Sequence, residues 1–222
     1  MTLPTWPIYL KLQTDHAYGP SRDAEASCAA SSAYIDRIGK ERPMTGSLLI
    51  GPGGPDEVRW FRGVVNGPLH VLTAHGPEVA AVDAAQIPDV IPELGDIHDM
   101  PYLSGVFDFV HAANVLEHTI APYIALMECR RVLRLGGVAN FVLPPFDGSD
   151  GGRSPFHLHC LTREVWVELM HKVGLEVTDV EVRCGTIDAS VKYIHYRALA
   201  VAPPAPHDKI LHELVTFKAM PR

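Results

Sequence analysis

The sequence predicts an α/β domain in which helices cover both faces of a mostly parallel sheet. Three observations support this fold class. Short buried apolar runs alternate with helical segments, a glycine-rich turn follows the first run, and polar residues follow later runs. Strands that alternate with helices form parallel sheets through right-handed crossovers. With 222 residues, 47% of them hydrophobic and 20% charged, the chain has the size and composition of one globular domain.

The first half of the chain changes from a mixed segment to strand and helix patterns at Ser47. Before this point, Ala24 to Ile38 is the best helix candidate, and the Arg42-Pro43 pair ends it. Pro55 suits the first position of a helix, with acidic residues directly after it. We therefore expect strands at residues 47–50, 69–73 and 90–94, and helices from 55 through 61 and near 78–85.

The second half continues the alternation and then turns antiparallel. An apolar run at 107–113 and another at 138–143 predict two strands, separated by a helix that ends near Arg130-Arg131. A further helix at 163–173 is stopped by Gly174. Alternating runs at 175–182 and 191–201 predict an antiparallel pair that completes a seven-stranded sheet, and prolines at 203–206 break the chain before a short helical tail.

Charge, hydropathy and cysteine usage limit the partners and the compartment. A net charge of -7 and a pI near 5.9 argue against a nucleic-acid surface. The densest basic group is Arg130, Arg131 and Arg134, which suits a helix end because cations complement exposed carbonyls. No segment is long and apolar enough to predict a membrane span, and the first residues lack a secretory pattern. Four widely spaced cysteines suit a reducing compartment, so we expect a cytoplasmic protein.

Several short motifs occur in order between residues 94 and 144. They are Gly95-Asp96, Phe107-Asp108-Phe109-Val110, Leu116-Glu117-His118, and the run from Arg131-Val132-Leu133 to Gly136-Gly137. This series resembles the class I S-adenosylmethionine-dependent methyltransferases, especially the small-molecule type related to methyltransferase type 11. The resemblance implies a Rossmann-like three-layer sandwich whose last strand is antiparallel, and S-adenosylmethionine as the cofactor.

The resemblance also implies a division of the chain. We expect an N-terminal helical arm or lid at residues 1–45, a Rossmann-like methyltransferase domain at 46–202 and a C-terminal tail at 203–222. The arm and the loop from Phe146 to His159 are expected to recognise the acceptor, because variable loops carry specificity on a fixed scaffold.

The implied cofactor site follows the carboxyl ends of the first four strands, where open α/β sheets bind ligands. In it, Gly51, Pro52 and Gly53 form the glycine turn, His75 or Glu78 holds the ribose, and Asp96 accepts from the adenine amino group. Ile97 flanks the ring, and Asn114 lines the methionine part.

Asp96 has an alternative role as a turn cap, which is common for aspartate. Leu49, Pro52 and His75 depart from the family pattern, and proline removes a backbone donor from the turn.

Three histidines are candidates for a catalytic base: His118, His157 and His159. Histidine titrates near neutral pH, and these three follow the fourth and fifth strands, although any one of the 12 histidines is more often a surface or core residue than a catalyst. The pair His157-x-His159 also suggests metal ligands. Because the sequence offers no evident carboxylate or cysteine set to complete such a site, we expect no metal.

The sequence thus predicts a methyltransferase that transfers a methyl group to the oxygen, nitrogen or carbon of a small-molecule acceptor. An alternative is a protein of the same fold with an altered cofactor site that performs another reaction or a binding role. A dinucleotide oxidoreductase is disfavoured, because no G-x-G-x-x-G opens the first helix. We expect no nucleic-acid or membrane partner, and a homodimer is compatible with the sequence.

Overall fold

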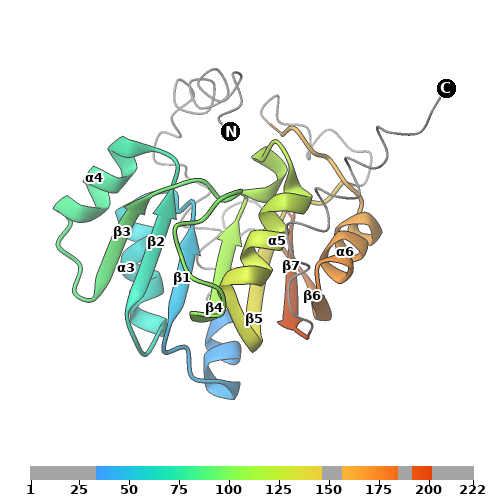
Figure 1. Ribbon diagram of the computed structural model, residues 1–222, viewed down its shortest axis with the longest axis horizontal. Helices are drawn as coiled ribbons and strands as arrows, with labels where there is room; N and C mark the ends of the chain where they lie inside the picture. Colours follow the sequence, from blue (N-terminus) through green and yellow to red (C-terminus); the bar gives the residue numbers. More distant parts are fainter. Residues whose placement is uncertain (1–33, 147–156, 185–191, 202–222) are drawn as a thin grey trace.

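The computed structural model describes residues 34–146, 157–184 and 192–201. Its centre is a seven-stranded sheet with the strand order β3-β2-β1-β4-β5-β7-β6 (Figure 1). The strands β1 to β5 pair in parallel, and β7 lies antiparallel between β5 and β6. The predicted fold class, including the antiparallel last strand, is confirmed.

The predicted helices and strands correspond closely to those observed. The elements in chain order are β1 (Ser47–Ile50), α3 (Pro55–Val64), β2 (Leu69–Thr73), α4 (Gly76–Ala84), β3 (Val90–Leu94), β4 (Phe107–Ala113), the 3-10 turn η1 (Leu116–His118), α5 (Pro122–Val132), β5 (Leu133–Leu143), α6 (Arg163–Lys172), β6 (Leu175–Cys184) and β7 (Lys192–Ala200). Pro55 occupies the first turn of α3, as its fixed φ angle favours.

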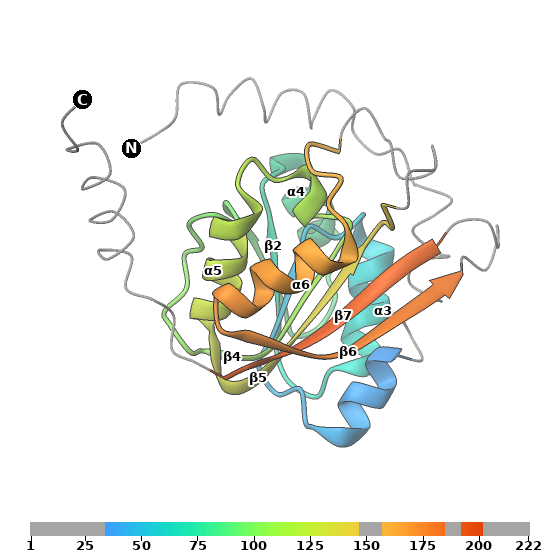
Figure 2. The same cartoon turned by 90° about the vertical axis from the view of Figure 1, so that its right-hand side faces the viewer.

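Helices cover both faces of the sheet, so the molecule has three layers. Helices α5 and α6 lie on one face, and α3 lies on the other with the helix at residues 34–41 (Figure 2). Each face has its own apolar core. Trp166 and Met170 of α6 contribute to the first core, and Val58 and Phe61 of α3 contribute to the second.

Residues 34–44 belong to the second core. Tyr34, Ile35 and Ile38 are fully buried, and Met44 joins them against α3 and the sheet. Of the helix predicted at Ala24 to Ile38, the described residues from 34 onward are helical, and the observed helix continues to residue 41. The rest of the predicted arm, the tail at 203–222 and most of the loop from Phe146 to His159 lie outside the described residues.

Two local details differ from a simple reading of the sequence. Glu117 and His118 lie in the single 3-10 turn η1 and not in α5, because the chain is extended at Thr119 and α5 starts only at Pro122. The residue before a proline avoids the helical region, which separates the two elements. The strand expected at 138–143 begins at Leu133, and its pairing with β4 shifts between Phe107 and Phe109. Gly136 provides the positive φ of 74° at this irregular pairing.

The basic residues near the end of α5 are structural. Arg130 donates hydrogen bonds to the carbonyl oxygens of Gly174 and Leu133 at 3.1 and 3.2 Å. Arg131 donates to the carbonyl oxygen of Tyr102 at 2.6 Å and forms an ion pair with the buried Glu128. Arg130 thus meets a carbonyl oxygen at the end of its own helix, as expected, and the other contacts connect α5 to neighbouring segments.

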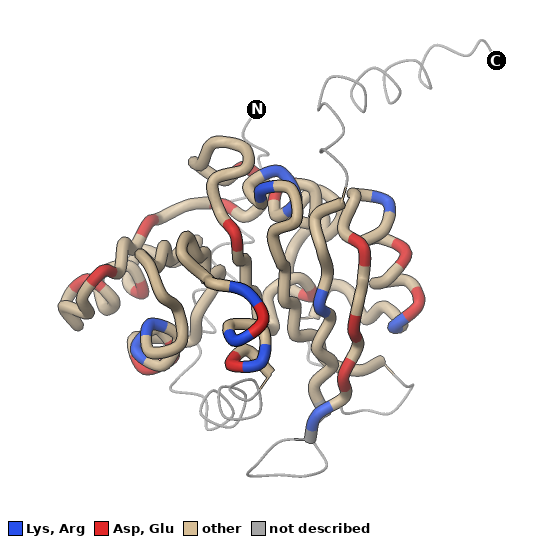
Figure 3. The backbone as a smooth tube through the Cα atoms, turned by 90° about the horizontal axis from the view of Figure 1, so that it is seen from below, with Lys and Arg blue, Asp and Glu red and all other residues tan. Residues whose placement is uncertain are grey.

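Charged residues of both signs are interspersed along the described chain (Figure 3). Arg37 pairs with Asp179 and Glu181 at 3.0 Å each, and Arg62 pairs with Asp89 at 2.7 Å. In the part of the chain that the structure describes, no helix has the length and apolar character needed to cross a lipid bilayer.

Candidate functional site

The carboxyl ends of β1, β2 and β4 meet at one edge of the sheet, which their arrowheads mark in Figure 1. Ile50, the last residue of β1, pairs with Leu72 of β2 and Ala112 of β4. The segments that follow these strands carry most of the predicted site residues. Parallel pairing therefore brings together groups that are far apart in the sequence.

The glycine turn begins directly after β1. The Gly51 amide donates to the carbonyl oxygen of Leu72 at 2.8 Å, and its φ is +60°. A side chain at Gly51 would place its Cβ 2.8 Å from a methyl group of Val115, so this position requires glycine. Pro52 is buried, and the Gly53 amide donates to the Glu57 carboxylate at 2.8 Å. The turn thus packs against the segment that follows β4.

A carboxylate lies at the end of β2, although no acidic residue ends the strand itself. Thr73, the last residue of β2, donates its hydroxyl to the Glu78 carboxylate, which reaches back from the first turn of α4. The His75 amide donates to the Thr73 hydroxyl oxygen at 3.2 Å. Burial, together with the charge of Glu57, raises the pKa of Glu78 to about 7, against the opposing effect of the Thr73 hydrogen bond. Of the two predicted alternatives, the structure brings the Glu78 carboxylate to the strand end.

Asp96 organises the turn after β3. Its Oδ1 accepts from the His98 amide at 2.9 Å and contacts the His98 ring nitrogen Nδ1 at 2.7 Å. The other ring nitrogen of His98 accepts from the Ala121 amide at 3.3 Å. His98 therefore connects this turn to the start of α5. Ile97 is buried in the same apolar core as Leu72. The bond from the His98 amide gives Asp96 the turn contact expected of a capping aspartate, and its role toward adenine stays a prediction.

Asn114 follows β4 in a left-handed conformation, with φ of +52°. Asparagine tolerates this region better than most residues. The backbone N–H of Asn114 donates to the carbonyl oxygen of Val142 in β5 at 2.9 Å. This bond holds the turn after β4 beside the end of β5.

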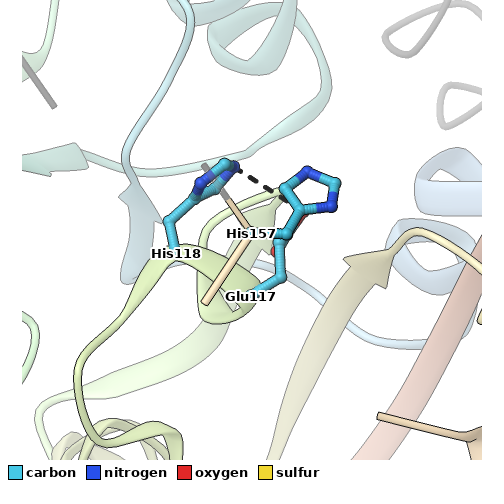
Figure 4. Close-up of side chains that lie close together, drawn as sticks. All are labelled: Glu117, His118 and His157. Carbon is cyan, nitrogen blue, oxygen red and sulfur yellow. Dashed lines mark ion pairs between the residues drawn. The ribbon is translucent and has the colours of Figure 1, made fainter. Parts of the chain in front are cut away.

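Glu117, His118 and His157 lie close together next to this turn (Figure 4). His118 and His157 have their ring centroids 4.8 Å apart at an interplanar angle of 76°. A Glu117 carboxylate oxygen lies 4.0 Å from the His118 Nε2. Glu117 is 1% exposed, and burial raises the pKa of its carboxyl group to about 8. The structure thus brings together two of the three predicted histidines.

The ring of the third histidine, His159, contacts a backbone carbonyl oxygen outside this cluster. The amides of Leu158 and His159 both donate to the Glu117 carbonyl oxygen, at 2.8 and 3.0 Å. The His159 Nε2 contacts the carbonyl oxygen of Ile120 at 3.3 Å. The segment at 157–159 is therefore attached to η1 by its backbone, with the His157 ring beside His118 and the His159 ring on the Ile120 carbonyl.

Sequence reasoning missed three side chains of this edge. Glu57 was assigned only to the first turn of its helix, His98 was given no role, and Glu117 was not considered as a partner of His157. Glu57 and His98 contact residues four and two positions away in the sequence, so a carboxylate or a ring close to a turn was a local signal for both. Glu117 and His157 are 40 residues apart, and no local pattern predicts their contact.

Comparison with known proteins identifies a family for the central part of the chain. Residues 50–141 match the family described as a methyltransferase domain. An uncharacterized 37.1 kDa protein in transposon TN4556 of Streptomyces fradiae is 49% identical over 127 residues, which are 55% of this chain and 36% of that protein. This chain thus spans about a third of the length of the curated relative that it matches.

Solved structures with the same fold include enzymes of different chemistry. The 1,6-didemethyltoxoflavin-N1-methyltransferase of Burkholderia thailandensis, with bound 1,6-didemethyltoxoflavin and S-adenosylhomocysteine, has a TM-score of 0.71 at 16% identity; the alignment covers 91% of this chain and 92% of that one. The 4+2 cyclase SpnF has a TM-score of 0.65 at 18% identity, covering 78% and 82% of the two chains. These similarities establish the fold.

Proposed function

Because this chain carries a methyltransferase domain on the class I S-adenosylmethionine-dependent methyltransferase fold, we propose that it transfers a methyl group from this cofactor to a small-molecule acceptor. One observation carries the proposal. The glycine turn after β1 and the Glu78 carboxylate at the end of β2 lie at the same sheet edge, within or beside the residues that match the family. This edge is where the fold binds a nucleoside.

We assign the cofactor contacts to residues of this edge. The turn at Gly51 to Gly53 allows close approach of the ligand to the backbone. The N-terminus of α3 follows this turn, and its partial positive charge favours negatively charged groups of the ligand. Glu78 is assigned to the ribose, because one carboxylate accepts hydrogen bonds from both hydroxyl groups. Asp96 and Ile97 are assigned to the adenine, and Asn114 to the methionine part. His75 is the secondary candidate for the ribose.

The cofactor supplies an electrophilic methyl group when bound, so the residues of the chain mainly align the acceptor and receive or redirect a proton. His118 and His157 are assigned to the acceptor side, because they lie beyond Asn114 at the end of β4. His159 is the weaker candidate, since its ring already contacts the Ile120 carbonyl. A small-molecule acceptor is supported by the Burkholderia structure, which contains 1,6-didemethyltoxoflavin.

A second function is favoured by the composition of the turn. Pro52 has no backbone N–H, and the Gly53 amide is already engaged by Glu57. These features suit a protein of the same fold with an altered cofactor site that performs another reaction or a binding role. The cyclase SpnF is a structure of similar fold whose name states a reaction other than methyl transfer.

Calorimetric titration with S-adenosylmethionine and S-adenosylhomocysteine separates the two functions. The methyltransferase proposal expects saturable binding of both ligands at one site per chain, with micromolar affinity. Folded protein that binds neither ligand would favour the second function. Binding of both would direct the search to the acceptor, with transfer of labelled methyl to candidate small molecules as the measurement.

We also propose a cytoplasmic location, based on the cysteines. Within the described residues, Cys129 is a buried free thiol. Free thiols are typical of reducing compartments.

A further inference from the structure

The cluster of Glu117, His118 and His157 contains groups that commonly bind metal ions. Each residue offers one ligand atom, and these atoms all lie within 4.8 Å of one another. Figure 4 shows the three side chains converging from η1 and from the segment before α6. The cluster joins parts of the chain that are 40 residues apart, so it is a product of the tertiary structure.

The Glu117 carboxylate is the second, independent observation. The side chain is 1% exposed, and neither of its oxygens has a hydrogen-bond partner. A buried carboxylate without a hydrogen bond is unfavourable, and buried carboxylates are normally paired at short distance, hydrogen-bonded or bound to a metal. A cation beside both oxygens would satisfy them.

The histidines are held in place by the backbone. Leu158 and His159 donate their amides to the carbonyl oxygen of Glu117, which fixes His157 beside the carboxylate of the same residue. His118 is adjacent to Glu117 in η1, where its own amide donates to the Val115 carbonyl oxygen at 3.0 Å. The arrangement therefore does not depend on a flexible side chain reaching across a cavity.

We propose that Glu117, His118 and His157 bind one divalent transition-metal ion of the zinc type. Two imidazoles and one carboxylate form a known zinc ligand set and also suit iron(II), whereas magnesium prefers oxygen ligands. Metal–ligand distances of about 2.0 to 2.1 Å place tetrahedral ligand atoms roughly 3.3 Å apart. The ligand atoms must therefore approach one another by about an ångström or more on binding, and the buried carboxyl group must lose its proton.

Three protein ligands leave a fourth position open. Structural zinc sites are usually closed by four protein ligands, whereas catalytic sites keep one position for water or substrate. On the proposed function, the open position lies on the acceptor side and takes an oxygen atom of the acceptor. The two imidazoles then act as metal ligands, and not as bases.

The test is a titration of tag-free, chelator-treated protein with Co²⁺, followed by its visible absorption, with Zn²⁺ as competitor. We expect one Co²⁺ per chain, displaced by Zn²⁺. Glu117→Gln and His157→Ala should each weaken Co²⁺ binding at least tenfold. His171→Ala is the matched control, because His171 is an exposed histidine near the end of α6, and its variant should bind like the parent. Circular dichroism confirms that each variant is folded.

Two results would overturn the inference. One is a folded parent protein without saturable Co²⁺ binding, and the other is equal affinity in the parent, Glu117→Gln and His157→Ala. The titration requires neither the cofactor nor an acceptor. Metal binding without S-adenosylhomocysteine binding would therefore support the metal site and contradict the proposed function. S-adenosylhomocysteine binding without metal binding would support the proposed function and contradict the metal site.

Discussion

At the scale of single residues, Glu78 is the group on which the proposed cofactor binding should depend. Its carboxylate lies at the end of β2, and its raised pKa of about 7 means that it is partly protonated near neutral pH. Glu78→Gln should weaken S-adenosylhomocysteine binding about tenfold or more, since a hydrogen bond to a charged group contributes roughly 1.5 to 3 kcal/mol. Calorimetry measures this change.

The pH dependence of the same affinity is a second readout. In the parent protein, affinity should rise from about pH 6 to about pH 8, because the deprotonated carboxylate accepts both ribose hydroxyls. Glu78→Gln should lack this rise. Glu176→Gln makes the same chemical change on an exposed residue of β6 and should bind like the parent. Equal affinity for Glu78→Gln and the parent would return the ribose role to His75.

Asp96 has two roles to separate, the turn it caps and the adenine it is assigned to bind. Asp96→Ala should weaken S-adenosylhomocysteine binding about tenfold or more, because a charge-assisted hydrogen bond is lost. His98→Ala removes the ring contact at 2.7 Å but keeps the carboxylate, so its loss of affinity should be smaller. If both variants lose the same affinity while folded, Asp96 acts only through the turn.

At the scale of elements, the ion pair inside α5 holds the loop after β3. Glu128 accepts from the Met100 amide at 2.8 Å and from Arg131 at 2.6 Å, and it is almost fully buried. Removing one partner of a buried pair leaves the other uncompensated, which costs about 3 to 5 kcal/mol. Glu128→Ala should lower the free energy of unfolding by about 3 kcal/mol or more in urea titrations.

A surface pair on α6 provides the comparison. Lys172 and Glu168 lie 3.0 Å apart with both side chains more than half exposed. Exposed pairs contribute about 0 to 1 kcal/mol, so Glu168→Ala should change the free energy of unfolding by less than about 1 kcal/mol. Similar losses for Glu128→Ala and Glu168→Ala would show that the buried pair does not anchor the loop.

At the scale of the whole molecule, two histidines buried in the sheet link stability to pH. Burial lowers the pKa of His111 to about 3, and burial with the charge of Arg183 lowers that of His195 to about 4. Both stay neutral in the folded state, whereas the unfolded chain protonates them near pH 6.5. The contribution of these two histidines to stability is therefore complete above about pH 6.5 and is lost as the pH decreases, by up to about 1.4 kcal/mol per pH unit for each histidine.

Replacing one of these histidines tests that linkage. His195→Leu removes a ring whose two nitrogens have no hydrogen-bond partner, so it should reduce the slope between pH 6.5 and about 4.5 by up to about 1.4 kcal/mol per pH unit. Urea unfolding at several pH values gives the slope. His171→Leu, at an exposed position, should leave it unchanged. An unchanged slope in His195→Leu would assign the acid sensitivity to other groups.

The sequence by itself determined the order and type of the elements. Ser47 to Ile50 and Phe107 to Ala113 are apolar runs of strand length, and Pro55 marks the start of a helix, so side-chain pattern and backbone restriction specify them locally. The glycine turn was also readable, because Gly51 adopts a positive φ that few other residues tolerate. Local physics was sufficient wherever neighbours in the chain decide the conformation.

Only the tertiary structure decided which side chains meet. The position of His98 between two loops and the proximity of Glu117 to His157 require the sheet to be assembled. Burial of a carboxylate or an imidazole is a property of the packed molecule, so no local sequence pattern reports it.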